Sequence, residues 1–437
     1  MNKQKEKLRA AFFKKFAPLI LAVATSILNI ACNRSHSEAP PQIVMEALPS
    51  PAPVGGIVPQ VSALHDGSTI LSWVEPRPDS GYTFRMGVQQ NEQWSEPQTI
   101  ASDTQMIMYA VILPSVTPFP NGTLLAHWDI HLPEDNDPYS NLIHVARSLD
   151  GGKSWSAPLV PHRDGVSGTH SFASTFPVGD SIGLVWLDAR RQRHVPPPPG
   201  ASDDEAQWHG TIGLQYTTIA PNGGLGADVT IDPMTCECCP TAAALTSRGP
   251  VVVYRDRQHA KGKADDGQSE IRDIQLIRLE RGHWTPPRRV HADNWMINGC
   301  PDNGPAIDAN GERVAVAWWT AAGDSSMVKV AFSENSGDSF STAIHLDQGN
   351  GDGQVTVALL DNGAVVGWLE NQETWARWVA PDGRMSTAVS LGPSPLRSRL
   401  PRWLEKDGSI FAVWTSKMEN DAKQVRIAKL RLVAPSS

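Results

Sequence analysis

The feature of this sequence that most constrains its fold is a repeated unit with one large aromatic residue near its centre. Each unit starts near a proline, continues with alternating apolar residues, turns at a pair such as Asp-Gly or Asn-Gly, and then runs into the aromatic residue. Apolar runs on both sides of a glycine turn are typical of a β-hairpin. The seven aromatic residues are Trp73, Trp128, Trp186, Tyr254, Trp318, Trp368 and Trp414.

A second pair of apolar runs follows each aromatic residue, as in residues 85–100 and 328–346. Four strands in about 40–50 residues is the period of one β-propeller blade. A single blade leaves both faces uncovered, and the aromatic residue would fill the wedge between neighbouring blades. We therefore predict an all-β fold, a β-propeller with seven four-stranded blades. The count falls to six if one weak unit is a long insertion.

The last unit, which ends at residues 424–433, is one strand short. Residues 42–48 (QIVMEAL) can supply that strand and close the ring, which removes an unpaired sheet edge. We expect residues 33–58 to form a tether and this closing strand, and residues 59–437 to form the propeller.

The first 32 residues predict export. Six basic residues precede an apolar run at residues 17–31, which is too short for a comfortable membrane-spanning helix. The run ends at Ala31-Cys32 and resembles a bacterial lipoprotein signal, with Cys32 as the lipidated residue. The alternatives are an ordinary cleaved signal and an uncleaved anchor. We expect a cell-envelope lipoprotein, periplasmic or at the outer membrane, that contacts the membrane only through its lipid.

The charge balance argues against a nucleic-acid partner. The net charge is −8 and no basic stripe is present, whereas phosphate binding needs clustered cations. We expect a monomer with a glycan or another polar small molecule as its ligand.

A motif in the predicted second hairpins carries a family resemblance. Residues 148–155 (SLDGGKSW) match the Asp-box, Ser-x-Asp-x-Gly-x-Ser/Thr-Trp, at every defining position, and residues 333–340 (SENSGDSF) are a second copy with two replacements. Over residues 59–433 the chain resembles the sialidase-like (BNR, Asp-box) β-propellers. That resemblance implies a structural role for Ser148, Asp150, Gly152, Trp155, Ser333, Gly337 and Phe340.

The resemblance to sialidases is incomplete at the positions that carry catalysis. Sialidases have an early Arg-Ile-Pro, but residues 57–59 read Ile-Val-Pro, so the first carboxylate-binding arginine is missing. Residues 75–77 (Glu-Pro-Arg) match the Glu-x-Arg that follows, and Asp79 could serve as the acid, although its spacing from Arg77 is short. No Tyr–Glu nucleophile pair can be assigned, which leaves exo-α-sialidase activity open.

Polar residues follow the aromatic residues directly, at the ends of the second strands. These strand ends should lie on one face of the propeller, so the polar side chains would converge on a central funnel. If the protein is a glycosidase, the resemblance implies carboxyl catalysis, and we predict Asp188, Asp256 and Glu75 as the catalytic carboxyls. Guanidinium groups bind carboxylates with two parallel hydrogen bonds. The predicted ligand-binding residues are Arg77, Arg190, Arg191, Arg255, Arg257 and Arg272. The alternative is a set of interblade and rim salt bridges.

Four further cysteines, Cys236, Cys238, Cys239 and Cys300, precede the prolines that open the fourth and fifth units. They should be close in space, and in an exported protein they predict one or two disulfides that include Cys300. The alternative is a thiolate site for copper or zinc; no other cofactor is predicted.

The leading functional hypothesis is a glycan-active or glycan-binding propeller, acting as an exo-glycosidase of anionic sugars if it is catalytic. The alternatives are a non-catalytic interaction propeller on the cell surface and a periplasmic metal-handling protein that uses the cysteines.

Overall fold

The computed structural model describes residues 39–109, 111–132, 139–195, 207–259, 270–297, 299–395 and 401–434. From Pro40 onward they belong to one unit. The predicted signal peptide, the lipidation of Cys32 and the start of the tether lie outside the described residues. No helix in the described part is long and apolar enough to cross a membrane.

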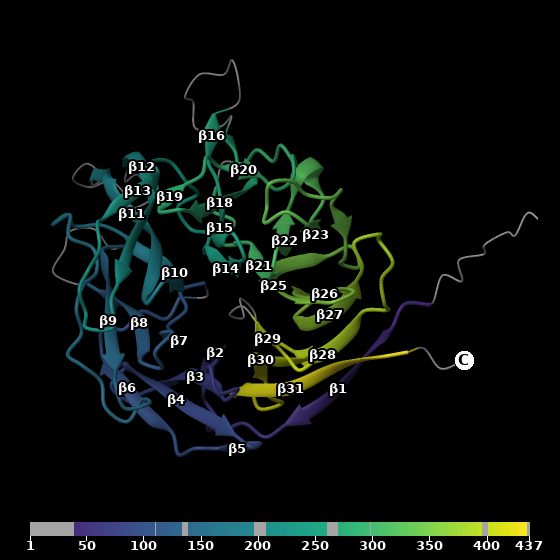
Figure 1. Cartoon of the computed structure of the whole chain (residues 1–437), viewed down its shortest axis with the longest axis horizontal. Coiled ribbons are helices and arrows are strands. Elements are labelled where there is room, and N and C mark those ends of the chain that lie inside the picture. Colours follow the sequence, from purple (N-terminus) through teal and green to yellow (C-terminus); the bar gives the residue numbers. More distant parts are fainter. Residues whose placement is uncertain are drawn as a thin grey trace, which may run out of the picture. The chain divides into compact units, whose positions relative to one another are not determined.

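Seven antiparallel sheets surround a common centre, which confirms the predicted seven-bladed propeller (Figure 1). Blade 1 contains β2 (Ile57–Ala63), β3 (Thr69–Pro76), β4 (Tyr82–Gln90), β5 (Gln93–Trp94) and β6 (Gln98–Asp103). Blade 2 contains β7 (Ser115–Pro118), β8 (Leu124–His131) and β9 (Asn141–Ser148), and a bridge from Val145 to Leu159 adds a fourth pairing. Blade 3 contains β10 (His170–Val178), β11 (Ser181–Val195), β12 (Gln207–Ile219) and β13 (Val229–Asp232).

The second half of the ring follows the same order. Blade 4 contains β14 (Ala242–Thr246), β15 (Gly249–Arg255), β18 (Ile274–Glu280), β19 (His283–Trp284) and β20 (Arg288–Arg289), with a small extension of β16 (Gln258–His259) and β17 (Glu270–Ile271). Blade 5 contains β21 (Ala306–Asn310), β22 (Arg313–Thr320), β23 (Met327–Ser333) and β24 (Ile344–His345), with a 3₁₀ turn at Ala322–Asp324. Blade 6 contains β25 (Gly351–Leu360), β26 (Gly363–Glu370), β27 (Glu373–Val379) and β28 (Val389–Pro393).

Blade 7 combines both ends of the propeller. It contains β29 (Arg402–Lys406), β30 (Ser409–Lys417) and β31 (Lys423–Val433), and β1 (Gln42–Leu48) completes it as the outer strand. Gln42 lies opposite Val433 and Leu48 opposite Ile427, in antiparallel register. The prediction that residues 42–48 supply the missing strand is confirmed.

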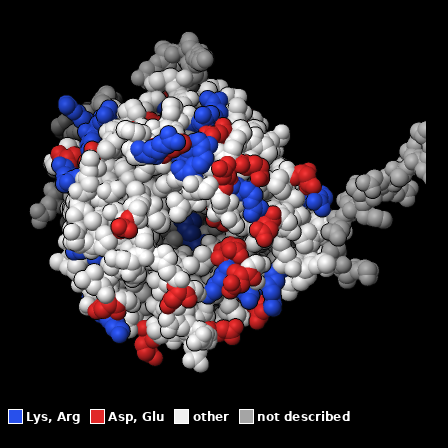
Figure 2. All heavy atoms as spheres, viewed as in Figure 1, with Lys and Arg blue, Asp and Glu red and all other residues white. Residues whose placement is uncertain are grey.

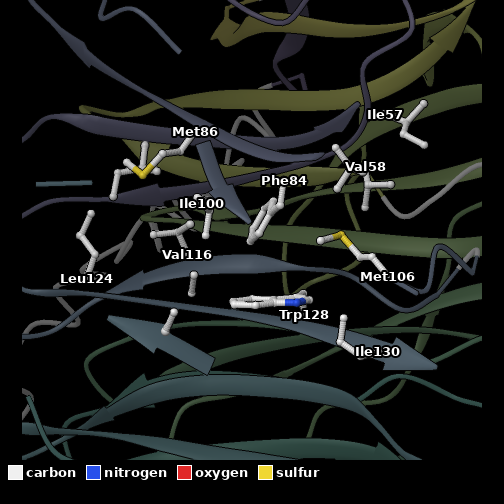
Figure 3. Packing of buried hydrophobic residues seen from close by; sticks show 14 residues of the cluster. Ile57, Val58, Phe84, Met86, Ile100, Met106, Val116, Leu124, Trp128 and Ile130 are labelled. Carbon is white, nitrogen blue, oxygen red and sulfur yellow. The ribbon is translucent and has the colours of Figure 1, made fainter. Parts of the chain in front are cut away.

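The seven aromatic residues are all buried, at 4 % exposure or less. Trp128 of β8 belongs to a cluster with Phe84 of β4 and Met106, and Figure 3 shows Phe84 directed toward the Trp128 ring. An aromatic side chain of one blade thus packs against the preceding blade, as the wedge interpretation predicts.

The two Asp-box turns form the same set of hydrogen bonds. Ser148 Oγ accepts the Gly152 N–H at 2.7 Å and donates to Asp150 Oδ1 at 2.8 Å. Asp150 Oδ1 also accepts the N–H four residues further on, at 2.9 Å. Residues 333–339 repeat this pattern with Asn335 in the place of the aspartate. The bonds are local to each turn, so they stabilise the blade and leave no group for ligand chemistry.

In each blade the inner strand begins at the end of the ring where the second strand finishes. In blade 1, for example, Ile57 at the start of β2 lies opposite Val74 near the end of β3. This end of the ring therefore carries the segments that enter the inner strands and the connections from second to third strands. We call this end the entry face. The Asp-box turns lie at the other end, since Ser148 lies opposite Leu124 at the start of β8. The described interblade segments of the entry face are 49–56, 104–109, 111–114, 160–169, 233–241, 290–297, 299–305, 346–350, 394–395 and 401.

The segment between blades 1 and 2 reaches across the entry face. Tyr109 Oη donates to Asp302 Oδ2 at 2.7 Å, in the segment between blades 4 and 5. Val111 and Ile112 are buried in a cluster with residues of blades 3 and 4. The central cavity of the ring is lined in part by Val111 and Leu113 of this segment and by none of the predicted charged site residues, so the predicted convergence of those residues on a central funnel is not observed.

Candidate functional site

Two arginines and two glutamates form a lattice on the entry face of blade 4. Arg257 Nε donates to Glu270 Oε2 at 2.6 Å, and Arg257 Nη1 donates to Glu237. Arg272 donates to the same two carboxylates, at 2.9 Å to Glu237 and 3.1 Å to Glu270. The Arg257 and Glu237 side chains are 18 % and 25 % exposed. The structure thus brings together two predicted ligand-binding arginines, and it adds Glu237, which the sequence analysis did not select.

Arg255 has a different role from the one predicted. Its guanidinium donates to the backbone carbonyls of Arg272, Asn303 and Trp319, at 2.7–3.1 Å, and lies 4.9 Å from the ring centre of Trp295. It is 2 % exposed. Because its donors are occupied by backbone groups of blades 4 and 5, Arg255 fixes the geometry between these blades and does not face a ligand.

Asp188 and Arg190 belong to a separate cluster between blades 2 and 3. Asp188 is fully buried, and it accepts the Trp186 indole N–H at 2.8 Å and two guanidinium bonds from Arg190 at 2.7 and 2.8 Å. Arg190 also donates to Asp228 at 3.0 Å. With its oxygens occupied and no exposed surface, Asp188 lacks the access that a general acid needs.

Two histidines extend this cluster. The rings of His162 and His170 stack with centroids 3.8 Å apart, and His170 Nε2 lies 3.1 Å from Asp164. Burial lowers the pKa of His170, but its hydrogen bond to Asp164 and the charge of Asp188 outweigh burial and raise the pKa overall. Burial lowers the pKa of His162 to about 4. These side chains are close enough to share a metal ion, but Arg190, 3.6 Å from Asp164, already supplies a positive charge.

The other predicted catalytic carboxyls are also constrained. Burial, assisted by the charge of Asp232, raises the pKa of Asp256 to about 7. This value suits a general acid at neutral pH, but the residue is only 3 % exposed. Glu75 accepts the Trp73 indole N–H at 2.8 Å and lies in blade 1.

The remaining predicted arginines lie elsewhere. Arg77 pairs with Asp79 at 2.5 Å in a surface turn of blade 1. Arg191 is an exposed residue of β11. Neither shares a partner with the lattice among the described residues.

The cysteines lie beside the lattice. Cys238 and Cys300 form a disulfide that joins the segments on either side of blade 4. Cys236 and Cys239 are buried free thiols with their sulfurs 3.4 Å apart, and Arg272 Nη1 lies 3.2 Å from the Cys236 sulfur. The Cys239 hydrogen bond lowers the pKa of Cys236 to about 7, aided by the Arg272 charge and opposed by burial. Burial raises the pKa of Cys239.

Together these groups form a continuous rim, which we call the disulfide rim: Tyr109, Glu237, Arg257, Arg272 and Asp302, around the Cys238–Cys300 disulfide. Asp302 lies within 4.8 Å of both bridged sulfurs, and Tyr109 is 39 % exposed. An exposed tyrosine offers an apolar ring and a hydroxyl, and the arginines offer planar donors. Figure 2 shows acidic and basic side chains interspersed around the ring on the face in view.

The fold defines the class of this protein as a seven-bladed β-propeller with four-stranded blades. The chain is similar to the polysaccharide lyase Uly1 (9 % identity, 88 % of this chain and 91 % of that one, TM-score 0.48). It is also similar to an α-L-arabinanase of Penicillium chrysogenum (13 %, 81 % and 98 %, 0.42) and to the Trypanosoma rangeli sialidase (11 %, 77 % and 56 %, 0.41). At such identities the likeness concerns the fold alone. No protein-family model matches the sequence, and neither does any curated protein.

The site residues missed by sequence analysis lie in segments between blades. Glu237 stands between two of the cysteines, and His162 and Asp164 precede blade 3. A search of polar residues before each inner strand, as well as after each aromatic residue, would have found them.

Proposed function

We propose that this protein binds acidic glycans at the disulfide rim. The observation that carries the proposal is the lattice of Arg257, Arg272, Glu237 and Glu270, in which Arg257 and Glu237 are partly exposed, on a rim that also exposes Tyr109. A sugar carboxylate would compete with Glu237 for the two guanidinium groups, and Tyr109 would offer its ring and hydroxyl. We also propose that the protein is an exported lipoprotein of the cell envelope.

The predicted catalytic carboxyl groups are poorly accessible, and this favours binding of a glycan over its hydrolysis. Asp188 is occupied by Trp186 and Arg190, and Asp256 has little exposed surface. The catalytic version of the proposal is an exo-glycosidase in which Asp256 acts as the acid. It requires Asp256 to become accessible when ligand binds.

The test compares binding of acidic and neutral oligosaccharides with turnover of fluorogenic glycosides. We expect Arg257→Ala to weaken binding of a uronic acid or sialic acid oligosaccharide by roughly tenfold or more, because a charge-assisted bond is worth about 1.5–3 kcal/mol. Tyr109→Ala should also weaken it. Arg77→Ala is the matched control, since it removes an ion-paired arginine from blade 1 of the same face.

If no acidic glycan binds, or if Arg257→Ala binds as the wild type does, the proposal is wrong. Hydrolysis of any glycoside that disappears in Asp256→Asn would establish the catalytic version instead.

A second candidate function is soft-metal binding by Cys236 and Cys239, supported by the 3.4 Å separation of their sulfurs. Since Cys238 and Cys300 are bonded to each other, the four cysteines provide two free thiols. Two thiolates suit Cu(I) better than zinc, which prefers four ligands.

Protein loaded with Cu(I) under anaerobic conditions, in competition with a chelator, should retain about one equivalent. The Cys236→Ser/Cys239→Ser variant should retain none. Equal retention by both proteins, or none by either, would exclude the site.

A further inference from the structure

A cavity of about 330 Å³ that is open to solvent lies on the propeller axis, lined by the inner strands of all seven blades. Its polar lining consists mainly of hydroxyl groups, including Ser62, Thr117 and Thr356. Among the described residues that line the cavity, Arg402 of β29 is the only lysine or arginine, and none is an aspartate or glutamate. Figure 2 shows a basic side chain deep in the central opening. The cavity therefore contains a cation without an acidic partner on its walls.

The contacts of Arg402 leave its charge uncompensated. Its Nε donates to Gln60 Oε1 at 2.9 Å, and its Nη1 makes a long bond of 3.4 Å to the carbonyl of Pro401. Burial lowers the pKa of Arg402 to about 10, so the group keeps its charge at neutral pH. His127 also lines the cavity, and burial lowers its pKa to about 4, which keeps it neutral. The Arg402 side chain is partly exposed, and a partly buried guanidinium without a counter-charge still loses part of its hydration.

Gln60 of β2 provides a second, independent sign of a ligand. Its Oε1 accepts from Arg402, which fixes the orientation of the amide. Its Nε2 is then a buried donor without a hydrogen-bond partner, on a residue that is 8 % exposed. Buried donors are almost always satisfied in native proteins, by protein, water or ligand. Because Arg402 and Gln60 lie side by side, their donors can serve one acceptor.

We propose that the axial cavity binds a small oxyanion, with the chemistry of phosphate, sulfate or a carboxylate, between Arg402 and Gln60. The anion supplies the counter-charge that Arg402 lacks and accepts the Gln60 amide N–H. This site is separate from the disulfide rim, since none of the rim residues lines the cavity. It uses donors contributed by blades 7 and 1, the two blades at which the ring closes.

Two measurements test the site on the full-length protein. In the first measurement, the protein is dialysed exhaustively into chloride buffer and then denatured. Ion chromatography measures the anions that the denatured protein releases. The same protein is titrated with phosphate, sulfate and acetate at constant ionic strength, by calorimetry and thermal unfolding. We expect about one tightly held oxyanion per chain, or saturable binding of at least one of the three that raises the melting temperature.

The variants make the test specific. Arg402→Met should abolish binding, and Gln60→Leu should weaken it by roughly tenfold, as expected for loss of a hydrogen bond to a charged group. Arg77→Met, which removes a surface arginine, should bind as the wild type does. If Arg402→Met does not fold, Gln60→Leu still decides the question.

The proposal fails if the wild type neither releases an oxyanion nor binds one saturably, or if Gln60→Leu and every folded Arg402 variant bind like the wild type. Glycan binding at the rim should be unchanged in Gln60→Leu, so failure of one proposal is distinguishable from failure of the other.

Discussion

At the scale of single residues, burial and pairing decide which charged groups remain available. The sequence places Asp188, Arg255 and Arg257 within three residues after a buried aromatic residue. In the structure, Asp188 is occupied by Arg190, Arg255 by backbone carbonyls, and only Arg257 keeps a partly exposed side chain. Residue type and spacing do not encode these differences, because the partners come from other segments.

Asp129 allows a test of how burial changes the pKa of a single carboxyl group. Burial raises its pKa to about 7, although a hydrogen bond from Ser171 and the charge of His170 oppose the shift. The folded protein then binds this proton more tightly than the unfolded chain does. The free energy of unfolding should therefore fall as pH rises from about 4 to about 7, by up to about 1.4 kcal/mol per pH unit from this group.

Urea unfolding at pH 5, 6 and 7 checks this prediction. In Asp129→Asn the part of the slope contributed by Asp129 should be absent, so the wild type should lose stability relative to the variant as pH rises from 5 to 7. Asp79→Asn, which alters an exposed carboxylate, should keep the wild-type slope. Parallel curves for the wild type and Asp129→Asn would show that Asp129 titrates normally.

At the scale of elements, strands and connecting segments differ in how well the sequence predicts them. The alternation of apolar residues predicts the blade strands because one side of each strand faces the neighbouring blade. The segments at 104–114 and 290–305 have no such period. They carry Tyr109, Asp302 and Cys300, and they meet through the Tyr109–Asp302 bond, while Cys300 is bonded to Cys238 in the segment before blade 4.

The Cys238–Cys300 disulfide should stabilise these segments by restricting the unfolded chain. It joins residues 62 positions apart, and a loop of this size corresponds to roughly 4 kcal/mol in the chain-entropy model. The Cys238→Ser/Cys300→Ser variant should have a free energy of unfolding that is lower by up to about 4 kcal/mol. Urea denaturation measures this difference.

Reduction provides the matched control for this prediction. Dithiothreitol should lower the stability of the wild type and leave that of the double variant unchanged. If the reductant affects both proteins equally, the bridge is not the source of the difference.

At the scale of the whole molecule, closure of the ring joins the two ends of the propeller. β1 pairs with β31 along the full length of β1. Without β1, the outer edge of β31 would be an unpaired strand edge. Open strand edges promote pairing between chains. Closure also brings Gln60 of blade 1 against Arg402 of blade 7, so the cavity site depends on it.

Deletion of residues 40–48 tests this role. We expect a lower melting temperature and concentration-dependent aggregation, measured by thermal unfolding with light scattering. The control is Glu46→Ala, which removes the ion pair with Arg431 but keeps the strand. A deletion variant that remains monomeric with an unchanged melting temperature would show that the outer strand of blade 7 is dispensable.

The sequence alone determined the architecture. Seven buried aromatic residues, the hairpin pattern and residues 42–48 predicted the blades and their closure, because blade packing repeats one local arrangement. The same repeat contained an unused signal for the cavity: the residue after the opening proline is Gln60, Ser115, Thr241, Ala306 or Arg402 in five units, and all five line the axis.

The tertiary structure decided which polar groups meet. Two such pairs, Tyr109 with Asp302 and Arg402 with Gln60, join segments far apart in the chain. A third pair, Arg257 with Glu237, joins neighbouring segments. The structure also decided that Val111 and Leu113 of an interblade segment, and none of the predicted charged site residues, help to line the central cavity. Such contacts depend on the path of irregular segments over the ring, which follows from packing in three dimensions and leaves no periodic trace in the sequence.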